Sequence, residues 1–296
     1  MVRYPLVTHA IGNGISVLVE KPVAVDCATI VDLVNNYLPD HSVFMDGTMF
    51  MHHLRTEKWY KAIRQRSKDH PGGKLTIHSA FSFNGGSADS SFFKLDIRNN
   101  KAGDPAGALG DLGHYCIRAA LVAALAVAPK IDADTPHCTH LPYQVFGEKS
   151  VEFPTIISVS CAPMEGGFVD SESDGTIRSC RACVVLSTIT LTFVCSFEEA
   201  FQQDLTIKYS SRSPDSGDFI VKMDDFVIPN APESATYDLI TFPPSGPLDD
   251  FHRRCTRVTT KVDTRDCCQE QRMFETFGRI RRTLEDSSRS EVSYDT

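Results

Sequence analysis

The second half of the chain contains three runs in which apolar and polar residues alternate. The run at 189–197 places Ile, Leu, Phe, Cys and Phe at every second position, and the runs at 205–209 and 219–223 repeat this period of two. Successive alternating strands separated by short polar breaks are typical of an antiparallel sheet with one covered face. The pattern therefore predicts an open sheet whose second face meets either solvent or a partner subunit.

The first fifty residues follow a different pattern. Residues 15–19 form a short β-rich run, residues 26–38 carry apolar side chains at helical spacing, and 42–45 indicate a second strand. A strand, a helix and a strand of these lengths are typical of a βαβ unit with a parallel strand pair. Further strands are expected at 75–83 and 156–161, and further helices at 51–65, 109–128 and 273–284. The predicted fold class is thus an α/β unit followed by an α+β domain whose open, mostly antiparallel sheet is flanked by helices.

Composition excludes several classes of protein. Thirty Lys and Arg against 38 Asp and Glu leave a net charge of −8, which excludes a general binder of nucleic acid or of an anionic membrane. The longest apolar run spans 119–128, well short of the roughly 20 residues that a membrane-spanning helix needs. The ten cysteines are scattered along the chain rather than arranged as a small disulfide scaffold, so a reducing, cytoplasmic location is expected.

The motif Glu20-Lys21-Pro22 directly follows the first predicted strand. Ligands of α/β sheets gather at the carboxyl ends of the strands, where a lysine fixed by a following proline can act as a cation. The alternative is a solvated lysine in a surface turn, which is the usual place of a charged residue. Spacing alone leaves both interpretations open.

A second motif, Gly-Asp-Leu-Gly-His-Tyr at 110–115, opens the long helix that follows it. Asp111 and Tyr115 are four residues apart, so they share a helical face near the positive end of the helix dipole. A phenol with a pKa near 10 is a poor base at neutral pH unless a nearby cation lowers that pKa. Lys21, Asp111 and Tyr115 therefore form a chemically sensible set if the fold brings them together. The alternatives are a capped helix start with an interfacial tyrosine, and His114 in the acid–base role.

Three further side chains are weaker candidates for binding. His52 and His53 follow a predicted strand, where they either contact a substrate or stabilise the turn. Arg98 either holds a substrate hydroxyl or carboxylate bidentately, or forms an ion pair with Asp96 or Asp104.

The pair Cys180 and Cys183 forms a lone Cys-x-x-Cys motif. A zinc site needs four ligands, and His137, Cys138 and His140 are the residues that could complete one. Lone cysteine pairs are mostly small buried apolar residues, so no metal site is predicted.

Together these motifs resemble the glucose–fructose oxidoreductase / inositol dehydrogenase (Gfo/Idh/MocA) family. The likeness is carried by Val-Leu-Val-Glu-Lys-Pro at 17–22, Phe-Met-Asp-Gly-Thr-Met-Phe-Met-His-His at 44–53 and Gly-Ala-Leu-Gly-Asp-Leu-Gly-His-Tyr-Cys-Ile-Arg at 107–118. The sequence is most similar to the plant-type and dihydrodiol-dehydrogenase-like branch. Shorter matches extend the likeness at 92–98, 195–197, 224–229 and 269–280.

The resemblance implies an oxidoreductase that depends on NAD or NADP. Such an enzyme transfers a hydride between the nicotinamide and a hydroxyl or carbonyl group of a carbohydrate-like or dihydrodiol substrate. Lys21 then lies near the nicotinamide, Tyr115 donates or accepts the proton, and Asp111 matches the motif aspartate. Glu20 and Pro22 flank Lys21 in the implied cofactor-binding motif.

The resemblance also divides the chain. Residues 1–47 correspond to the C-terminal part of a Rossmann domain and 48–284 to a substrate and dimerisation domain that ends in a helix. The polar, charged composition of 285–296 predicts a disordered tail. His114 falls at a position that varies within the family. The expected partners are a small-molecule substrate and a second copy of the chain, bound through the open face of the sheet.

One departure from the family concerns the cofactor. The family's phosphate-binding Gly-x-Gly-x-x-Gly is absent, and the sole Gly-x-Gly, at 12–14, leads into a strand instead of opening a helix. The chain is therefore expected to lack the first part of its dinucleotide-binding domain, as a truncated product or an incomplete gene model. The alternative function is a non-catalytic module for binding or dimerisation. Two lesser departures are Leu54, where the branch has a proline, and the long polar segment at 163–181, which indicates an inserted loop.

Overall fold

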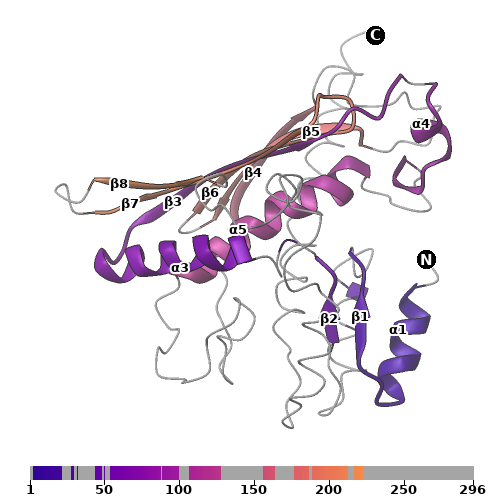
Figure 1. Ribbon diagram of the computed structural model, residues 1–296, viewed down its shortest axis with the longest axis horizontal. Helices are drawn as coiled ribbons and strands as arrows, with labels where there is room; N and C mark the ends of the chain where they lie inside the picture. Colours follow the sequence, from indigo (N-terminus) through magenta and orange to yellow (C-terminus); the bar gives the residue numbers. More distant parts are fainter. Residues whose placement is uncertain are drawn as a thin grey trace.

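The computed structural model describes residues 3–21, 28, 29, 32, 44–48, 50, 54–87, 89–99, 107–127, 156–163, 177–186, 189–212 and 217–222. Most of the helix expected at 26–38, the helix expected at 273–284 and the tail at 285–296 lie outside these residues. Figure 1 shows a small N-terminal unit, built on two strands, and a larger unit in which helices lie against one side of a broad sheet.

The N-terminal unit consists of α1 (Arg3–Gly12), β1 (Val17–Val19) and β2 (Phe44–Asp46). The two strands run parallel, which confirms the predicted parallel pair. Gly14 adopts a φ of 73°, and its N–H donates a 2.8 Å hydrogen bond to the carbonyl of Ile11. A glycine in this left-handed conformation commonly terminates a helix, so Gly14 ends α1 and turns the chain into β1.

The larger unit is built on a six-stranded sheet. In spatial order its strands are β4 (Ile156–Pro163), β5 (Ser179–Leu186), β6 (Ile189–Ser196), β3 (Lys74–Ser82), β7 (Gln202–Ser210) and β8 (Asp218–Lys222). Neighbouring strands are antiparallel except β3 and β6, which run parallel. The predicted mostly antiparallel sheet is therefore confirmed. The central place of β3, between β6 and β7, was not predicted.

Strand β5 shows that the end of the segment expected to be an inserted loop, 163–181, belongs to a strand, whereas 164–176 lie outside the described residues. Ser179, Cys180 and Arg181 belong to this strand, and Cys180 pairs with Pro163 at the end of β4. The buried residues at the start of β5 are small (Ser, Cys and Ala), so their burial leaves a weak apolar signal in the sequence.

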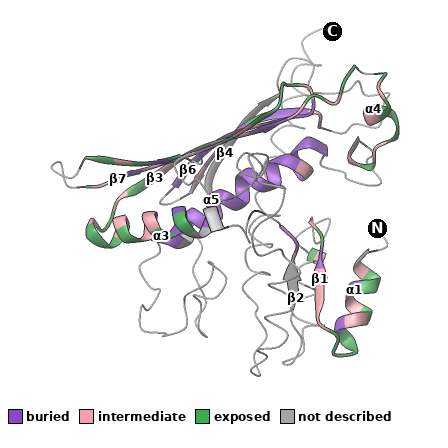
Figure 2. Ribbon diagram, in the orientation of Figure 1, coloured by how far each residue is buried: buried purple, intermediate pink, exposed green. Residues whose placement is uncertain are grey.

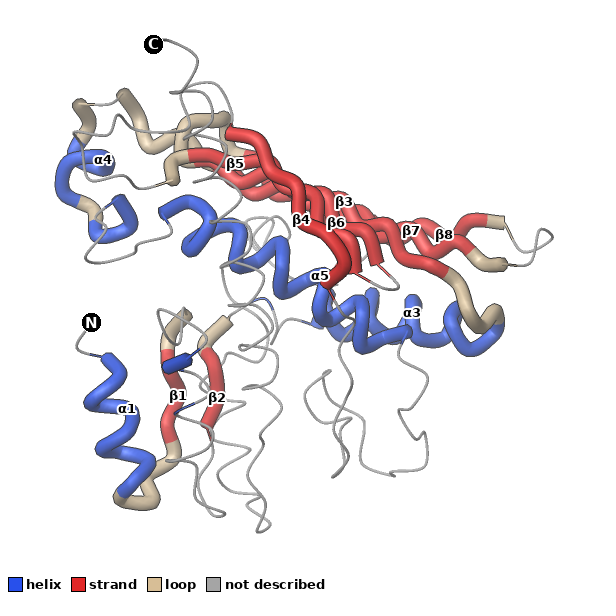
Figure 3. The backbone as a smooth tube through the Cα atoms, turned by 180° about the vertical axis from the view of Figure 1, so that it is seen from behind, coloured by secondary structure: helices blue, strands red, loops and turns tan. Residues whose placement is uncertain are grey.

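Two long helices, α3 (Leu54–Asp69) and α5 (His114–Val127), lie on the same side of the sheet, as Figures 1 and 3 show from opposite directions. Both were predicted, but the first turn of the helix expected at 109–128 is a π-helical turn, η3 (Leu109–Gly113). A π turn is wider than an α turn and is frequent at functional sites. Two short elements follow β3: α4 (Ser91–Leu95) and the 3₁₀ turn η2 (Ile97–Asn99).

The core lies between the sheet and these helices. Along β6 the side chains of Ile189, Leu191, Phe193 and Cys195 are buried, whereas those between them up to Val194 are partly exposed. Nearly all of α5 is buried beneath this face (Figure 2). The predicted alternation therefore marks the face of the sheet that the helices cover. Among the described residues, no helix has both the length and the apolar character needed to cross a membrane.

Candidate active site

The carboxyl ends of β1 and β2 form one edge of the N-terminal unit. Lys21 follows β1 and Thr48 follows β2, so both side chains leave the parallel pair at this edge. The N–H of Gly47 donates a 2.7 Å hydrogen bond to the carbonyl of Val19. A Cβ on Gly47 would lie 3.2 Å from that same oxygen, closer than ordinary contact, so a glycine suits this approach. The hydrogen bond between Gly47 and Val19 thereby fixes the backbone just before Lys21.

The opposite wall of the site is the π-helical turn η3, which carries Asp111. Gly107, just before the turn, has a φ of 52°, and a Cβ there would overlap the carbonyl oxygen of Ile177. The N–H of Ala108, the next residue, donates a 2.7 Å hydrogen bond to the same carbonyl oxygen. A Cβ on Gly113 would lie 2.9 Å from a side-chain carbon of Leu109 and 3.4 Å from β6 side chains. These two glycines allow η3 to pack closely against the sheet, which holds Asp111 in place.

Lys21 and Asp111 are in direct contact. The ammonium of Lys21 forms an ion pair with Oδ1 of Asp111 and donates a 2.9 Å hydrogen bond to the main-chain carbonyl of the same residue. The two side chains are only 12% and 13% exposed, so water screens the pair weakly. Two of the three ammonium donors are directed at one residue, which fixes the position of the charge.

Tyr115 lies beside this ion pair. The ammonium of Lys21 is 4.9 Å from the centre of the Tyr115 ring, within the range of a cation–π contact. Phe81 and Phe50 flank the ring, with centroids 5.3 and 6.0 Å away, and Tyr115 is 5% exposed. The structure therefore brings together the three residues that the sequence grouped, and it adds an apolar wall around the phenol.

His114 faces a different partner. Its side chain is fully buried, and its Nε2 shares a 2.8 Å hydrogen bond with Oγ1 of Thr48, which is also fully buried. This contact ties the end of β2 to the start of α5. This contact gives His114 a structural partner, but Tyr115 is buried as well, so the acid–base role of Tyr115 rather than His114 stays a prediction.

Arg98 forms the ion pair that the sequence left as one alternative. Its Nε and Nη2 donate to the two carboxylate oxygens of Asp96 at 2.8 and 2.7 Å, and its Nη1 lies 3.5 Å from Oδ2 of Asp111. Hydrogen bonding to Arg98 holds the pKa of Asp96 below its usual value, although burial acts in the opposite direction. The same hydrogen bonds raise the pKa of Arg98, against the effect of burial. Substrate contact by Arg98 stays a prediction.

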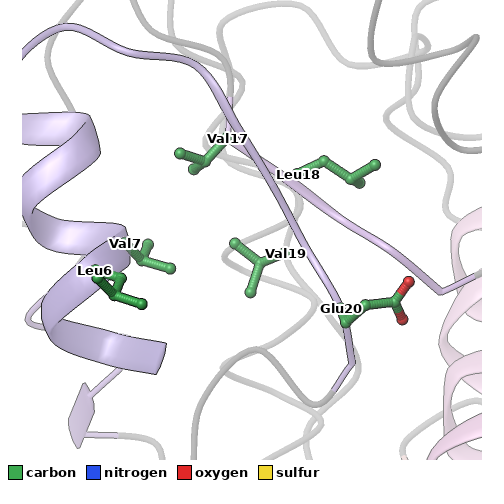
Figure 4. A pocket seen from close by; sticks show the side chains of 6 residues that line it. All are labelled: Leu6, Val7, Val17, Leu18, Val19 and Glu20. Carbon is green, nitrogen blue, oxygen red and sulfur yellow. The ribbon is translucent and has the colours of Figure 1, made fainter. Parts of the chain in front are cut away.

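Other predicted residues lie apart or outside the described residues. Four of the predicted residues lie outside the described residues: Pro22, His52, His53 and Asp104. The sequence motifs assign Pro22 to the cofactor and the two histidines to the substrate. Glu20 is exposed at the end of β1. It borders a pocket of about 290 Å³ between α1 and β1, where the side chains of Leu6, Val7, Val17, Leu18 and Val19 form the remaining lining (Figure 4). The carboxylate of Glu20 points away from α1 in this view.

The cysteine motif lies on a strand and not in a loop. Residues three apart on a strand point to opposite faces, and accordingly Cys180 is buried whereas Cys183 is partly exposed. Cys180 faces Cys195 of β6, with 3.6 Å between the sulfur atoms. Within the part of the chain that the structure describes, no group of three or more His, Cys, Asp or Glu residues is placed to hold a metal ion. His137 and Cys138 lie outside that part.

The apolar wall around Tyr115 was not predicted from the sequence. Phe81 lies near the end of β3 and Phe50 follows β2, and nothing in the local pattern of either segment marks these rings as neighbours of a phenol on α5. Phe81 lies beside Tyr115 because β3 occupies a central position in the sheet, between β6 and β7. The π turn likewise has no signature in the sequence.

Comparisons with known proteins identify similar folds. No family model matches the sequence. The structure is similar to GenD2 from gentamicin A biosynthesis in complex with NAD, with a TM-score of 0.63 and 13% identity over 97% of this chain and 74% of that chain. It is also similar to KijD10, a 3-ketoreductase from Actinomadura kijaniata in complex with NADP and TDP-benzene, with a TM-score of 0.58 and 12% identity over 96% and 75% of the two chains. An inositol dehydrogenase homolog from Azotobacter vinelandii, complexed with NAD⁺, gives a TM-score of 0.59 and 11% identity over 96% and 74%.

These similarities concern the fold, because the identities lie between 11 and 13%. They confirm the predicted fold class. An inositol dehydrogenase homolog is among the matched structures, as the sequence motifs led us to expect. The chain thus has the fold of a group of structures that includes a ketoreductase and an inositol dehydrogenase homolog solved with nicotinamide cofactors.

Proposed function

We propose that this chain is an NAD(P)-dependent oxidoreductase that transfers a hydride between a nicotinamide and a hydroxyl or carbonyl group of a carbohydrate-like or dihydrodiol substrate. The observation that carries the proposal is the meeting of an ammonium, a carboxylate and a phenol, those of Lys21, Asp111 and Tyr115, at one strand edge. Structures of similar fold contain NAD or NADP, which supports the choice of cofactor. The dihydrodiol-dehydrogenase-like branch rests on the sequence motifs.

The residues at this edge fit the nicotinamide end of such a cofactor. Glu20, Lys21 and Pro22 would hold it, because they follow β1 at the carboxyl edge where α/β folds bind ligands. A bound nicotinamide supplies the hydride donor or acceptor, and the protein supplies orientation and proton transfer. The sequence contains no Gly-x-Gly-x-x-Gly to bind the pyrophosphate of the cofactor, and this absence supports a second candidate function.

The protein's own side chains manage the proton. When a carbinol is oxidised, its hydroxyl proton must leave the oxygen as the hydride leaves the carbon. The phenolate form of Tyr115 accepts this proton during oxidation and becomes the neutral phenol, which returns the proton during reduction. Lys21 stabilises negative charge on the phenol or on the substrate oxygen, and Asp111 holds Lys21 and orients the substrate. His52 and His53 are further proposed substrate contacts.

Calorimetric titration with NADH and NADPH tests the proposal. We expect one of them to bind with a dissociation constant below about 1 mM, the upper end of usual Michaelis constants. Lys21→Met should weaken this binding, whereas Lys74→Met, which removes an exposed lysine on β3, should not. If neither NADH nor NADPH binds, the proposal is contradicted.

The second candidate function is a non-catalytic module for binding or dimerisation. The absence of the glycine motif favours this alternative. A protein that lacks a phosphate-binding loop loses a major part of its affinity for a dinucleotide. A folded chain that binds neither cofactor, yet self-associates, is the result that this alternative predicts.

We also propose a homodimer that forms through the face of the sheet opposite α3 and α5. On β6 this face presents Thr190, Thr192 and Val194, which are partly exposed, and the two long helices lie on the opposite face. Small and β-branched side chains suit contact between two sheets. Sedimentation should show a dimer that Thr192→Arg converts to a monomer, and a wild-type monomer would contradict this assignment. The protein is proposed to reside in the cytoplasm, since Cys116, Cys180, Cys183 and Cys195 are free thiols.

A further inference from the structure

We propose that Arg98 is a positioning residue that acts through Asp111: it binds one carboxylate oxygen while Lys21 binds the other, so that Asp111 does not fully neutralise the Lys21 ammonium. This inference rests on the proposed function for its consequence in catalysis. The shared carboxylate itself follows from the contacts of Arg98, Asp111 and Lys21.

The segment that carries Arg98 is anchored to the sheet by aromatic rings. Phe83 and Phe92 pack edge to face with their centroids 5.2 Å apart, and Phe197, just after β6, packs against both at the same distance. Ser90 caps α4 by accepting from the N–H of Phe93, and it donates a 2.7 Å hydrogen bond to the carbonyl of Gly85. The loop that follows β3 is therefore a packed structure.

Asp96 fixes the orientation of the guanidinium. Besides the two side-chain hydrogen bonds described above, its Oδ1 accepts from the main-chain N–H of Arg98 at 3.0 Å. The guanidinium carbon lies 5.0 Å from the ring centre of Phe92 and 5.7 Å from that of Phe83, so the rings form a shelf beside the charge. With Nε and Nη2 held by Asp96, Nη1 is the end that reaches Asp111.

The charge arithmetic around Asp111 explains what this arrangement achieves. Lys21 and Asp111 alone sum to zero, and such a pair would present little net charge to Tyr115. Arg98 adds a second positive charge to the same carboxylate, so Lys21, Asp111 and Arg98 sum to +1. The balancing carboxylate of Asp96 lies on the far side of Arg98, and Coulomb interactions weaken with distance. These three groups therefore keep a net positive charge beside the phenol, which favours proton removal from an alcohol.

The fork geometry also explains why this position holds an arginine. An arginine can contact one carboxylate with two nitrogens and a second carboxylate with the third, because its donors are fixed in a plane. A lysine has one nitrogen and could not bridge Asp96 and Asp111 in this way. Arg98→Lys should therefore recover only part of the function of Arg98.

A double-mutant cycle tests the inference without any need for activity. Lys21→Met and Arg98→Met are made singly and together in the full chain, and urea unfolding gives the midpoint of each variant. Each single change leaves Asp111 one cation, whereas the double change leaves it none. We therefore expect the midpoint loss of the double variant to exceed the sum of the two single losses.

Two controls make the cycle specific. Arg178 also lies over the aromatic cluster, 4.5 Å from the ring of Phe93, but it pairs with Glu198, so Lys21→Met and Arg178→Met should be additive. In an Asp111→Asn background the coupling between positions 21 and 98 should fall to what the mutual repulsion of the two cations contributes. Additive losses for Lys21 and Arg98 in the wild-type background would overturn the inference, whether or not the protein binds a cofactor.

Steady-state kinetics separate positioning from direct substrate contact once a substrate is found. A positioning role predicts that Arg98→Met lowers kcat at least tenfold with KM changed less than threefold, and that Arg98→Lys restores part of kcat. A rise in KM with unchanged kcat would instead make Arg98 a substrate contact. A cycle that shows coupling in a chain that binds no nicotinamide would preserve the shared carboxylate and refute only the proposed function.

Discussion

The ammonium of Lys21 donates a 2.9 Å hydrogen bond to the main-chain carbonyl of Asp111, across a separation of 90 residues in the chain. A main-chain acceptor stays in place when a side chain is replaced, so this contact depends on the path of η3 as well as on the carboxylate. The site therefore relies on two independent features: the charge of Asp111 and the geometry of the turn that carries it.

Removal of the Tyr115 hydroxyl should abolish most of the turnover. Tyr115→Phe keeps the ring between Phe50 and Phe81, so the fold should persist, while the proton donor is lost. General acid–base catalysis is usually worth ~10²–10⁴ in rate, and we expect a loss of that size in kcat. Tyr60→Phe, which removes a buried hydroxyl on α3, is the matched control and should keep its rate. A Tyr115→Phe enzyme within a few-fold of wild type would exclude the assigned role.

The ion pair of Asp96 with Arg98 should make stability depend on pH in the acid range. The pKa of Asp96 is lowered in the folded protein, so its contribution is present above the unfolded pKa and is lost as pH falls through the folded value. Both side chains are partly exposed, at 26% and 39%, so this contribution should be about 1 kcal/mol or less at neutral pH. Urea unfolding of wild type and Asp96→Asn should differ at pH 6 and converge below about pH 4. A difference that grows on acidification would contradict the pairing.

The buried thiols at the contact between α5 and the sheet should resist alkylation in the native protein. Burial raises the pKa of Cys116 to about 12, and the hydrogen bond with Cys180, together with burial, raises the pKa of Cys195. At pH 8 a thiol with a pKa near 12 has about 10³-fold less thiolate than an ordinary cysteine. Mass spectrometry after brief iodoacetamide treatment should show label on Cys183 before Cys116 or Cys195, and on all three in urea. Early native labelling of Cys116 would show that this part of the core opens readily.

A side chain at Gly107 should destabilise the fold. Gly107→Ala combines a φ of 52° with an overlap between the new Cβ and the carbonyl of Ile177, and we expect a loss of about 1–3 kcal/mol. Gly12→Ala is the matched control, because Gly12 ends a helix and nothing lies within 4 Å of a Cβ there. The control should be neutral or stabilising by ~0.5 kcal/mol in urea unfolding. Equal effects at the two positions would show that the approach of η3 to Ile177 is looser than described.

Sequence patterns predict those parts of the fold in which burial alternates with exposure. The strands near 189–197 and 205–209 were predictable because one face of each is covered by helices. The parallel contact of β3 with β6 was not, because it joins residues more than 100 positions apart and alternation does not identify a neighbour. Residues 3–12 form a helix that was not predicted, and its buried side chains are few, chiefly Val7 and Ile11.

The candidate site was predictable in its charged and phenolic groups and not in their surroundings. Lys21, Asp111 and Tyr115 stand out because they lie in the two motifs, at 20–22 and 110–115, that carry the family resemblance. The packing of Phe81 against Tyr115 depends on where β3 lies in the sheet, and the fork between Asp96 and Arg98 was one of several pairings that the sequence allowed. Long-range placement is therefore what the structure contributes.

The π-helical turn at Leu109–Gly113 contains, in effect, one residue more than an α-helical turn of the same rise. Deleting a single residue there would restore regular α geometry and rotate Asp111 by about 100° relative to α5. The helix and the sheet beneath it would keep their packing, but the carboxylate would no longer face Lys21. Loss of one residue from this turn would thus separate the carboxylate from the Lys21 ammonium.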